Sequence, residues 1–231
     1  MSFFEKCALI FTNPKYLDSL MTGLRTTIVV SVGAAALGLV LGTIVALIGL
    51  ANTKNPLMKP PKLICTVYVT VVRGTPMALQ LFIMAFVILA IRNFPLVITA
   101  IIAFGVNSGA YVSENIRGGI LSVDAGQTEA GRSLGLSAGA TMWYIVIPQA
   151  IKNVIPSIGN ELIALIKETS IVSMIGMYDL TAAAKILGSG QNLASYGPSM
   201  TAAALFYLAI VYLLTLLIKI IERRLRQSDR R

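Results

Sequence analysis

Residues 26–51 are TTIVVSVGAAALGLVLGTIVALIGLA, and no side chain in this stretch carries a charge. A helix needs about 20 mainly apolar residues to cross the hydrocarbon core of a membrane. The rest of the chain has the same character, since 56% of its residues are hydrophobic and 13% are charged, against about a quarter charged in soluble domains. The sequence therefore predicts an all-α integral membrane protein.

Four more spans are predicted after the first, which makes about five transmembrane helices. The second is interrupted by Arg73-Gly74-Thr75-Pro76, and the fourth is unusually polar. The segment 1–25 has an apolar pattern that suits either an amphipathic helix in the membrane interface or a lead-in to the first span. The predicted spans cover about residues 26–51, 63–91, 95–117, 151–174 and 199–221.

The basic residues predict the orientation of these spans. With five spans, the loop 52–62, the segment 117–152 and the tail 222–231 lie on one side of the membrane, and together they carry 11 of the 19 Lys and Arg residues. Positive loops are cytoplasmic, so the N-terminus is predicted outside and the C-terminus inside. Since no repeat or linker is visible, the predicted organisation is an extracytoplasmic or interfacial segment 1–25, a transmembrane domain 26–221 and a basic cytoplasmic tail 222–231.

Several function classes do not fit this composition. The net charge is +9, but the basic residues gather at the ends of hydrophobic runs and form no stripe for nucleic acid. The chain has no histidine, and Cys7 and Cys65 are far apart, so neither a metal site nor a disulfide is predicted. No Gly-x-x-x-x-Gly-Lys-[Ser/Thr] phosphate loop occurs. We expect no catalytic residues and no cofactor on this chain.

The first span carries Gly38 and Gly42 four residues apart. Such a pair of small residues allows two helices to approach closely. The partner is either another helix of this chain or the same helix of a second copy.

Ionisable residues lie inside the fourth span, where each costs roughly 2.5–3.5 kcal/mol on insertion scales. Such a polar stripe faces either a water-filled path or a structural network that pairs with Arg73 or a neighbouring subunit. At 100° per residue its members share an arc of roughly 120°. The stripe consists of Asn153, Ser157, Asn160, Glu161, Lys167 and Glu168.

The second and third spans add polar groups. Pro76 lacks an N–H and Gly74 loosens the same turn, so a helix broken there frees backbone groups that can hold a polar ligand. A simple proline kink is the alternative. Donors and acceptors of both signs suit a zwitterion. The polar side chains are Arg73, Thr75 and Gln80 beside the break, and Asn107, Tyr111 and Glu114 on one face of the third span.

The cytoplasmic loop, about residues 122–148, contains Glu129-Ala130-Gly131-Arg132-Ser133-Leu134-Gly135 and then Ile145-Val146-Ile147-Pro148. Asp124 is predicted to begin a short helix that Gly135 ends, and Ser137 is predicted to begin a second helix that runs to Ile147. Val123, Ala130, Leu134 and Leu136 give the element an apolar side, which either binds a partner or caps the protein's own helices.

This loop resembles the "EAA" loop of bacterial ABC importer permeases, with Gly131 in place of the third Ala and Ile147 in place of Leu. From about Tyr16 to Leu225 the chain resembles the permease subunit of polar amino acid ABC importers of the histidine/glutamine/arginine/opine type. The other matching stretches are Val72-Arg73-Gly74-Thr75-Pro76, Asn107-Ser108-Gly109-Ala110-Tyr111, Glu114-Asn115-Ile116-Arg117-Gly118-Gly119-Ile120, Gln127-Thr128, Gln149-Ala150, Pro156, Gly159-Asn160-Glu161 and Lys167-Glu168-Thr169-Ser170.

The resemblance implies the type I ABC importer permease fold and a multi-pass place in the bacterial cell (inner) membrane. It implies a second permease subunit, identical or a sister chain, an extracytoplasmic amino acid-binding protein, and a cytosolic ATPase dimer that holds ATP and Mg. The coupling residues it implies are Glu129, Ala130, Gly131, Gly135, Ile145 and Pro148. The substrate-binding residues it implies are Gly74, Thr75, Asn160, Glu161, Glu168, Thr169 and Ser170.

Glu161 bears on the choice of substrate. A carboxylate beside Asn160 can bind a cationic side chain, which favours a cationic amino acid over glutamine, glutamate or cystine, but it can equally hold the fold together by pairing with Lys or Arg. The alternative function is a stand-alone channel or secondary transporter for a small polar solute. That protein would need no ATPase and no exposed loop around Gly135.

Overall fold

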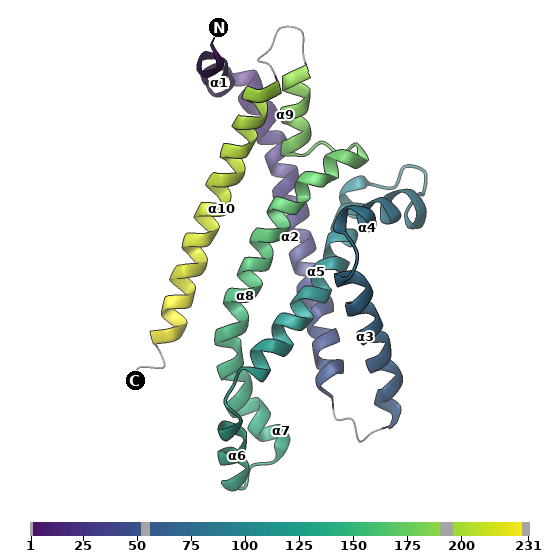
Figure 1. Cartoon of the computed structure of the whole chain (residues 1–231), viewed down its shortest axis with the longest axis vertical. Helices are drawn as coiled ribbons and strands as arrows, with labels where there is room; N and C mark the ends of the chain where they lie inside the picture. Colours follow the sequence, from purple (N-terminus) through teal and green to yellow (C-terminus); the bar gives the residue numbers. More distant parts are fainter. Residues whose placement is uncertain (1, 52–55, 190–195, 228–231) are drawn as a thin grey trace. The chain divides into compact units, whose positions relative to one another are not determined.

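The computed structural model describes residues 2–51, 56–189 and 196–227, with side chains as far as Leu225. Within these ranges the regular structure is helical and contains no strand (Figure 1). The predicted all-α class is therefore confirmed. The elements are α1 (Phe3–Thr12), α2 (Pro14–Leu50), η1 (Pro56–Met58), α3 (Lys59–Arg73), α4 (Met77–Ile83), η2 (Met84–Ile88), α5 (Leu96–Leu121), α6 (Ala125–Ser133), α7 (Ala138–Thr141), η3 (Met142–Val146), α8 (Ile147–Glu168), η4 (Thr169–Ile175), α9 (Leu180–Ser189) and α10 (Tyr196–Gln227).

Among the described residues, three helices are long and apolar enough to span a membrane, namely α2, α5 and α10. The count rises to five if two broken pairs of helices each form one span. Helix α2 begins at Pro14, well before the first predicted span. Proline is favoured in the first turn of a helix, and hydropathy marks the apolar part of a helix but not its polar extension.

The helix is interrupted at the place where the second predicted span was expected to be interrupted. Helix α3 ends at Arg73, and the Gly74 N–H donates to the Thr70 carbonyl at 3.0 Å. Pro76 has an extended backbone and precedes α4, which passes into the π turn η2. Proline has no N–H for the helical ladder, so the interruption follows from the sequence at this point.

The described structure forms two compact units, which we describe separately. Unit 1 is Met1–Leu37, Thr75–Gly105 and Leu162–Leu214. Unit 2 is Gly38–Gly74, Val106–Glu161 and Thr215–Arg231.

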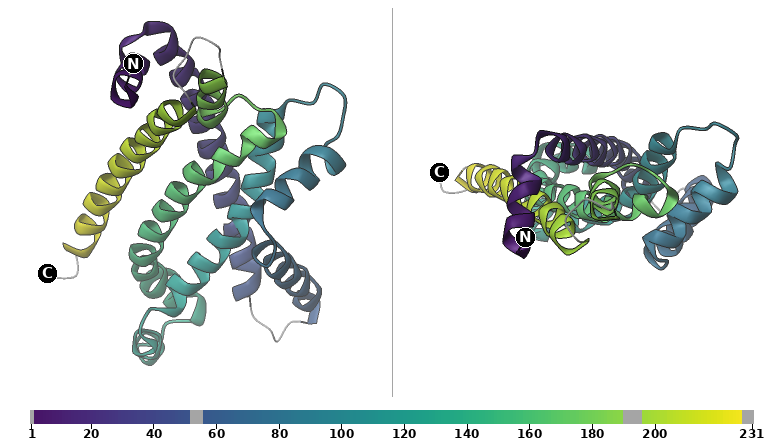
Figure 2. Two further views of the ribbon diagram at one scale, coloured as in Figure 1. Left: turned by 45° about the horizontal axis from the view of Figure 1, so that its top comes forward. Right: turned by 90° about the horizontal axis from the view of Figure 1, so that it is seen from above.

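One core of unit 1 joins α9 to the first part of α2 and the start of α10, which lie side by side in Figures 1 and 2. Asp179 is fully buried and begins α9, because its carboxylate accepts the N–H groups of Thr181 and Ala182 at 3.0 and 2.9 Å. The Tyr207 hydroxyl reaches the same carboxylate at 3.4 Å. The buried apolar residues of this core are Ile10, Leu20, Leu24, Leu180, Ala183, Ala184, Leu187, Ala202 and Ala203.

A second core of unit 1 joins α2, α4, α5, α8 and η4. Phe104 is its largest fully buried side chain. Polar groups inside this region bond within their own helices, as the Thr169 hydroxyl does to the Ile166 carbonyl at 2.7 Å. The buried apolar residues are Val30, Ala34, Leu81, Ala100, Ala103, Phe104, Leu165, Val172, Ile175 and Met177.

In unit 2, the last part of α2 packs directly on α5. A Cβ atom on Gly38 would lie 2.8 Å from the Ser108 side chain, and one on Gly42 would lie 2.7 Å from the Val112 side chain. The two glycines therefore serve helix packing within the chain, one of the two predicted uses.

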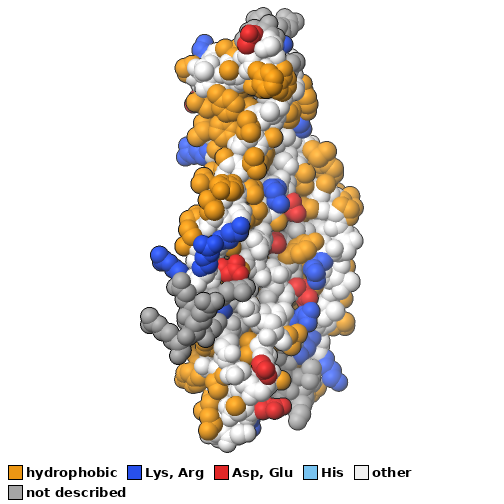
Figure 3. Space-filling view, turned by 60° about the vertical axis from the view of Figure 1, so that its left-hand side comes forward, with side chains coloured by type: hydrophobic (Ala, Val, Ile, Leu, Met, Phe, Trp, Pro, Cys, Tyr) orange, Lys and Arg blue, Asp and Glu red, His pale blue; other side chains and the backbone are white. Residues whose placement is uncertain are grey.

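Large apolar side chains cover much of the surface. On the face drawn in Figure 3, hydrophobic side chains are spread widely with charged side chains between them. On α10, Leu208, Tyr212 and Leu213 are each about 60% exposed, at 63%, 62% and 60%. Such exposure is unfavourable in water and suits a surface that faces lipid or other membrane helices.

Candidate functional site

The predicted cytoplasmic element begins with a capped helix in unit 2. The Asp124 side chain accepts the Gly126 N–H at 2.7 Å, and α6 follows. Aspartate is favoured at this position because it satisfies an N–H that the helix leaves unpaired. The predicted start of this helix is confirmed.

The same helix ends at Gly135, as predicted. Gly135 has φ +85°, in the left-handed region that glycine enters without steric cost. The Leu136 N–H donates to the Gly131 carbonyl at 3.2 Å, and the Gly135 N–H donates to the Arg132 carbonyl at 3.0 Å. This pair of bonds is the Schellman arrangement, which turns the chain sharply after α6.

The second helix begins as predicted but does not end at Pro148. The Ser137 hydroxyl accepts the Ala140 N–H at 3.2 Å and begins α7. The π turn η3 then leads straight into α8, which contains Pro148 in its first turn. Proline is tolerated there because the wider turn before it changes the hydrogen-bonding register.

The packing around residue 131 explains why this loop has glycine where the EAA pattern has its third alanine. It is buried, and a Cβ atom at this position would lie 2.8 Å from both the Ile145 and Thr141 side chains. Glycine thus lets α6 lie tightly against α7 and η3. Of the other residues predicted for coupling, Glu129, Ala130, Gly135 and Pro148 are exposed and Ile145 is half-buried.

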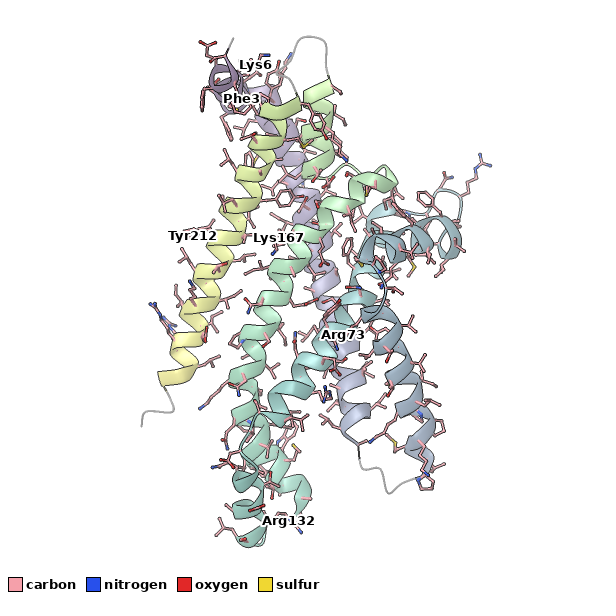
Figure 4. The ribbon with its side chains drawn as sticks, in the orientation of Figure 1. Phe3, Lys6, Arg73, Arg132, Lys167 and Tyr212 are labelled. Atoms are coloured by element: carbon pink, nitrogen blue, oxygen red, sulfur yellow. The ribbon has the colours of Figure 1, made fainter. Side chains whose placement is uncertain are left out.

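The apolar side of the element is unevenly exposed. Leu134 is 82% exposed, whereas Val123 and Leu136 are half-buried. Arg132 marks this end of the unit in Figure 4, and its guanidinium donates to the Leu136 carbonyl at 2.5 Å. The sequence interpretation did not single out Trp143 and Tyr144 on η3, which are 66% and 72% exposed. Their signal was two adjacent aromatic residues at the entry to a span, a pattern typical of membrane interfaces.

Two hydrogen bonds tie this element to α8. The Gln149 amide donates to the Gln127 side chain at 3.2 Å, and the Asn153 amide donates to the Ser122 hydroxyl at 2.9 Å. Asn153 belongs to the predicted polar stripe, so the stripe begins at the contact between α8 and the cytoplasmic element.

Three of the predicted substrate-binding residues lie in unit 2. Gly74 is exposed at the end of α3. Asn160 is exposed on α8, and the neighbouring Glu161 is half-buried.

The other four lie in unit 1, in varied settings. The Thr75 hydroxyl and carbonyl accept the Gln80 amide at 2.7 and 3.1 Å. Thr169 is fully buried with its hydroxyl bonded to its own helix. Glu168 is exposed at the end of α8, next to the exposed Lys167 that Figure 4 labels on the same helix. Ser170 is half-buried in η4.

A charge cluster in unit 2 joins α3 to α5. Arg117 forms two bonds to the Glu114 carboxylate, at 3.0 and 2.7 Å, and Arg73 lies 3.5 Å from the same carboxylate. The Arg73 guanidinium also lies 5.3 Å from the centre of the Tyr111 ring (Figure 4). Tyr111 and Glu114 therefore share a face as predicted, and Arg73 pairs with an acid of the third span.

Comparisons with known proteins place the chain in a family. Residues 38–227 match the family described as "Binding-protein-dependent transport system inner membrane component". The chain is 37% identical over 212 residues to the "Arginine transport system permease protein ArtQ" of Bacillus subtilis (strain 168), which covers 91% of this chain and 94% of that protein. It is 39% identical over 220 residues to the "Putative glutamine transport system permease protein GlnP" of Rickettsia typhi, with coverage of 94% and 97%.

The fold agrees with these relatives. A "Crystal structure of an amino acid ABC transporter with histidines" superposes with a TM-score of 0.83 at 37% identity, covering 91% of this chain and 95% of the other. The resemblance seen in the sequence is thus confirmed. The chain belongs to the family of inner membrane components of binding-protein-dependent transport systems, among its amino acid permeases.

Proposed function

We propose that this chain is the transmembrane subunit of an ATP-driven amino acid importer and forms the translocation path for a cationic L-amino acid. The named substrates of its relatives support an amino acid, and the carboxylate of Glu161 on the polar stripe of α8 supports a cationic one. The remaining predicted substrate residues would bind the amino and carboxyl groups that every amino acid shares.

The proposed topology has five spans in the bacterial inner membrane, with the N-terminus outside and the C-terminus in the cytoplasm. Its support is the family of the chain together with the basic residues of 52–62, 117–152 and 222–231. The proposed partners are a cytosolic ATPase dimer that holds ATP and Mg, a second permease subunit and an extracytoplasmic binding protein.

The observation that carries the proposal is the link between the cytoplasmic element and α8. Leu134 offers an apolar contact for an ATPase, and the α6 that it follows has hydrogen-bonded caps at both ends. The bonds Gln127–Gln149 and Ser122–Asn153 would pass its displacement to α8, the helix that also bears Glu161. ATPase motion would thereby reach the polar stripe.

The docking surface is tested by co-purification of the ATPase with Leu134→Asp. Leu57→Asp is the matched control, since Leu57 is 79% exposed on η1, outside the element. A central apolar contact in a protein interface contributes about 2 kcal/mol or more, so Leu134→Asp should weaken ATPase binding roughly 30-fold while the control retains it. Equal retention by both variants would contradict docking at Leu134.

The substrate is tested by ATP hydrolysis in liposomes that contain the chain, its co-purifying ATPase and the cognate binding protein, scanned against the amino acids. A hydrogen bond to a charged group contributes about 1.5–3 kcal/mol, so Glu161→Gln should raise the concentration of arginine, lysine or histidine needed for half-maximal stimulation at least roughly tenfold. Unchanged stimulation in Glu161→Gln would mean that Glu161 has a structural role and does not bind the substrate. If no ATPase binds at all, the importer proposal fails in favour of a stand-alone channel.

A further inference from the structure

A cavity of about 430 Å³ lies within unit 2, outside all the residues predicted to bind substrate. It is bordered by the last part of α2, by α3 and by α5, which are neighbours in Figures 1 and 2. The α3 residues recur at three- and four-residue spacing, so one whole face of that helix lines it. The lining residues are Val45, Ala46 and Gly49 of α2, Lys62, Cys65, Thr66, Val69, Thr70 and Arg73 of α3, and Ser113, Glu114 and Arg117 of α5.

The described lining carries more positive than negative charge. Lys62, Arg73 and Arg117 are cationic, and Glu114 is the single acid among them. That one carboxylate already serves both guanidiniums, at 2.7 Å from Arg117 and 3.5 Å from Arg73. Lys62 donates to the Ala51 carbonyl, which is neutral. Two positive charges in the cavity are therefore left without a counter-charge among the lining groups.

Such an excess is unfavourable beside apolar walls. Cations within a membrane are expensive unless an anion or water compensates them. The cationic groups are two guanidinium forks and an ammonium, which match the oxygens of a phosphate group. Of the lining hydroxyls, those of Thr66 and Ser113 already donate to the Lys62 and Ala110 carbonyls. The cavity is thus suited to a phosphate-bearing anion.

The outer flank of α3 indicates which anion. Leu63, Ile64, Val67 and Val71 are 65%, 69%, 52% and 56% exposed. Leu63 borders the cavity face of α3, and the other three continue around the outer side of the same helix. Lys62 and Arg73 are about 16 Å apart along α3, so one phosphate meets either Lys62 or the Arg73–Arg117 pair. A ligand with its phosphate at either place would find the apolar strip on the outer side of the same helix. A diacyl lipid has both parts, whereas a free anion would leave the strip unused.

We propose that this cavity binds the headgroup of an acidic phospholipid, with its acyl chains along the exposed flank of α3. Basic pockets between membrane helices are known to hold such headgroups. The lipid site stands independently of transport, and only its assignment to the cytoplasmic leaflet rests on the proposed topology.

Cys65 provides the test, because it lines the cavity and is one of two cysteines in the chain. The Cys7→Ser variant leaves it as the sole cysteine. The full chain with its ATPase is placed in nanodiscs of phosphatidylcholine with increasing fractions of phosphatidylglycerol, and maleimide modification of the Cys65 peptide is timed by mass spectrometry. Phosphatidylglycerol should slow the modification in a saturable manner.

Removing one cation should weaken this protection. Each Lys or Arg at an anionic lipid contributes roughly 1 kcal/mol, so Lys62→Gln and, separately, Arg117→Gln should each raise the half-protecting lipid fraction about fivefold. Lys59→Gln is the matched control, because Lys59 begins the same helix but does not line the cavity. It should leave protection unchanged.

Three results would overturn the lipid site. They are equal modification rates with and without phosphatidylglycerol, equal protection by inorganic phosphate in phosphatidylcholine nanodiscs, and protection by the transported amino acid. The second would mean a site for a small anion, and the third would place the cavity on the substrate path. If phosphatidylglycerol protects Cys65 but no amino acid stimulates ATP hydrolysis by the unmodified complex, the proposed function is refuted and the lipid site still stands.

Discussion

The contact between α2 and α5 allows a sharp test of the fold through Gly42. A Cβ atom at this position would lie 2.7 Å from the Val112 Cβ and Cγ1 atoms and 2.8 Å from the Gly109 carbonyl oxygen. Two of these three atoms cannot turn away, since one belongs to the backbone and one is the branch point of a stiff side chain. Gly42→Ala should therefore push the two helices apart.

The size of the effect follows from these distances. The added methyl must retreat from 2.7 Å to at least 3.4 Å, where van der Waals contact becomes ordinary, a movement of about 0.7 Å. Overpacking of this kind costs about 1–3 kcal/mol, and alanine returns roughly 0.5–1 kcal/mol through its better helix propensity. The net loss is about 1 kcal/mol at the centre of a range of about 0–2.5 kcal/mol, and the central value is a fall of roughly 2–4 °C in melting temperature for a chain of this size.

The assay is thermal unfolding of the purified protein, followed by circular dichroism at 222 nm. Gly49→Ala is the control on the same helix, because no atom lies within 4 Å of a Cβ there. It should gain roughly 0.5–1 kcal/mol from helix propensity alone. The same substitution is thus expected to have opposite signs at the two positions.

A double variant completes the test. Val112→Ala removes Cγ1, one of the three atoms that meet the new methyl, so its effect in the Gly42→Ala background should be smaller than in the wild type by a coupling energy of about 0.5 kcal/mol or more. If Gly42→Ala melts at or above the temperature of Gly49→Ala, or if the two substitutions are additive, then Gly42 does not pack against α5 as described.

Two further substitutions test the structure elsewhere. Asp179→Ala should lower the free energy of unfolding by about 1–3 kcal/mol and the melting temperature with it. The substitution removes the carboxylate that two N–H groups at the start of α9 and the Tyr207 hydroxyl use as acceptor. An unchanged melting temperature would mean that this buried carboxylate does not hold α9. Gln149→Leu should leave ATPase binding intact but reduce amino acid-stimulated ATP hydrolysis several-fold, since it removes the hydrogen bond of about 1 kcal/mol to Gln127 on α6. Full stimulation would exclude this bond from coupling. A loss of ATPase binding as large as the loss of hydrolysis would indicate that the substitution damages the whole element.

Features encoded by neighbouring residues could be predicted from the sequence. Asp124, Gly135 and Ser137 act through hydrogen bonds to residues at most five positions away, and all three form the caps that were predicted. The break at Pro76 has the same local origin, since it follows from a missing N–H. A run of apolar residues marks a span in the same way, because it must match the membrane thickness.

The course of the helix through Pro148 could not be predicted. Pro148 was expected to end a helix, and the preceding π turn lets the helix continue. The sequence pattern alone did not show that the five residues before Pro148 adopt the wider hydrogen-bonding register of a π turn.

The amino-acid sequence alone determined the helical membrane class, the family and the capped helices of residues 122–148, because hydropathy and capping are properties of short stretches of chain. Tertiary structure alone decided that Gly42 packs against α5 and that Gly131 packs under η3. It also paired Arg73 and Arg117 with one carboxylate, in a cavity that Lys62 lines as well. Those outcomes depend on which helix faces are in contact, and contacts between helices that are distant in the sequence form only in the packed structure.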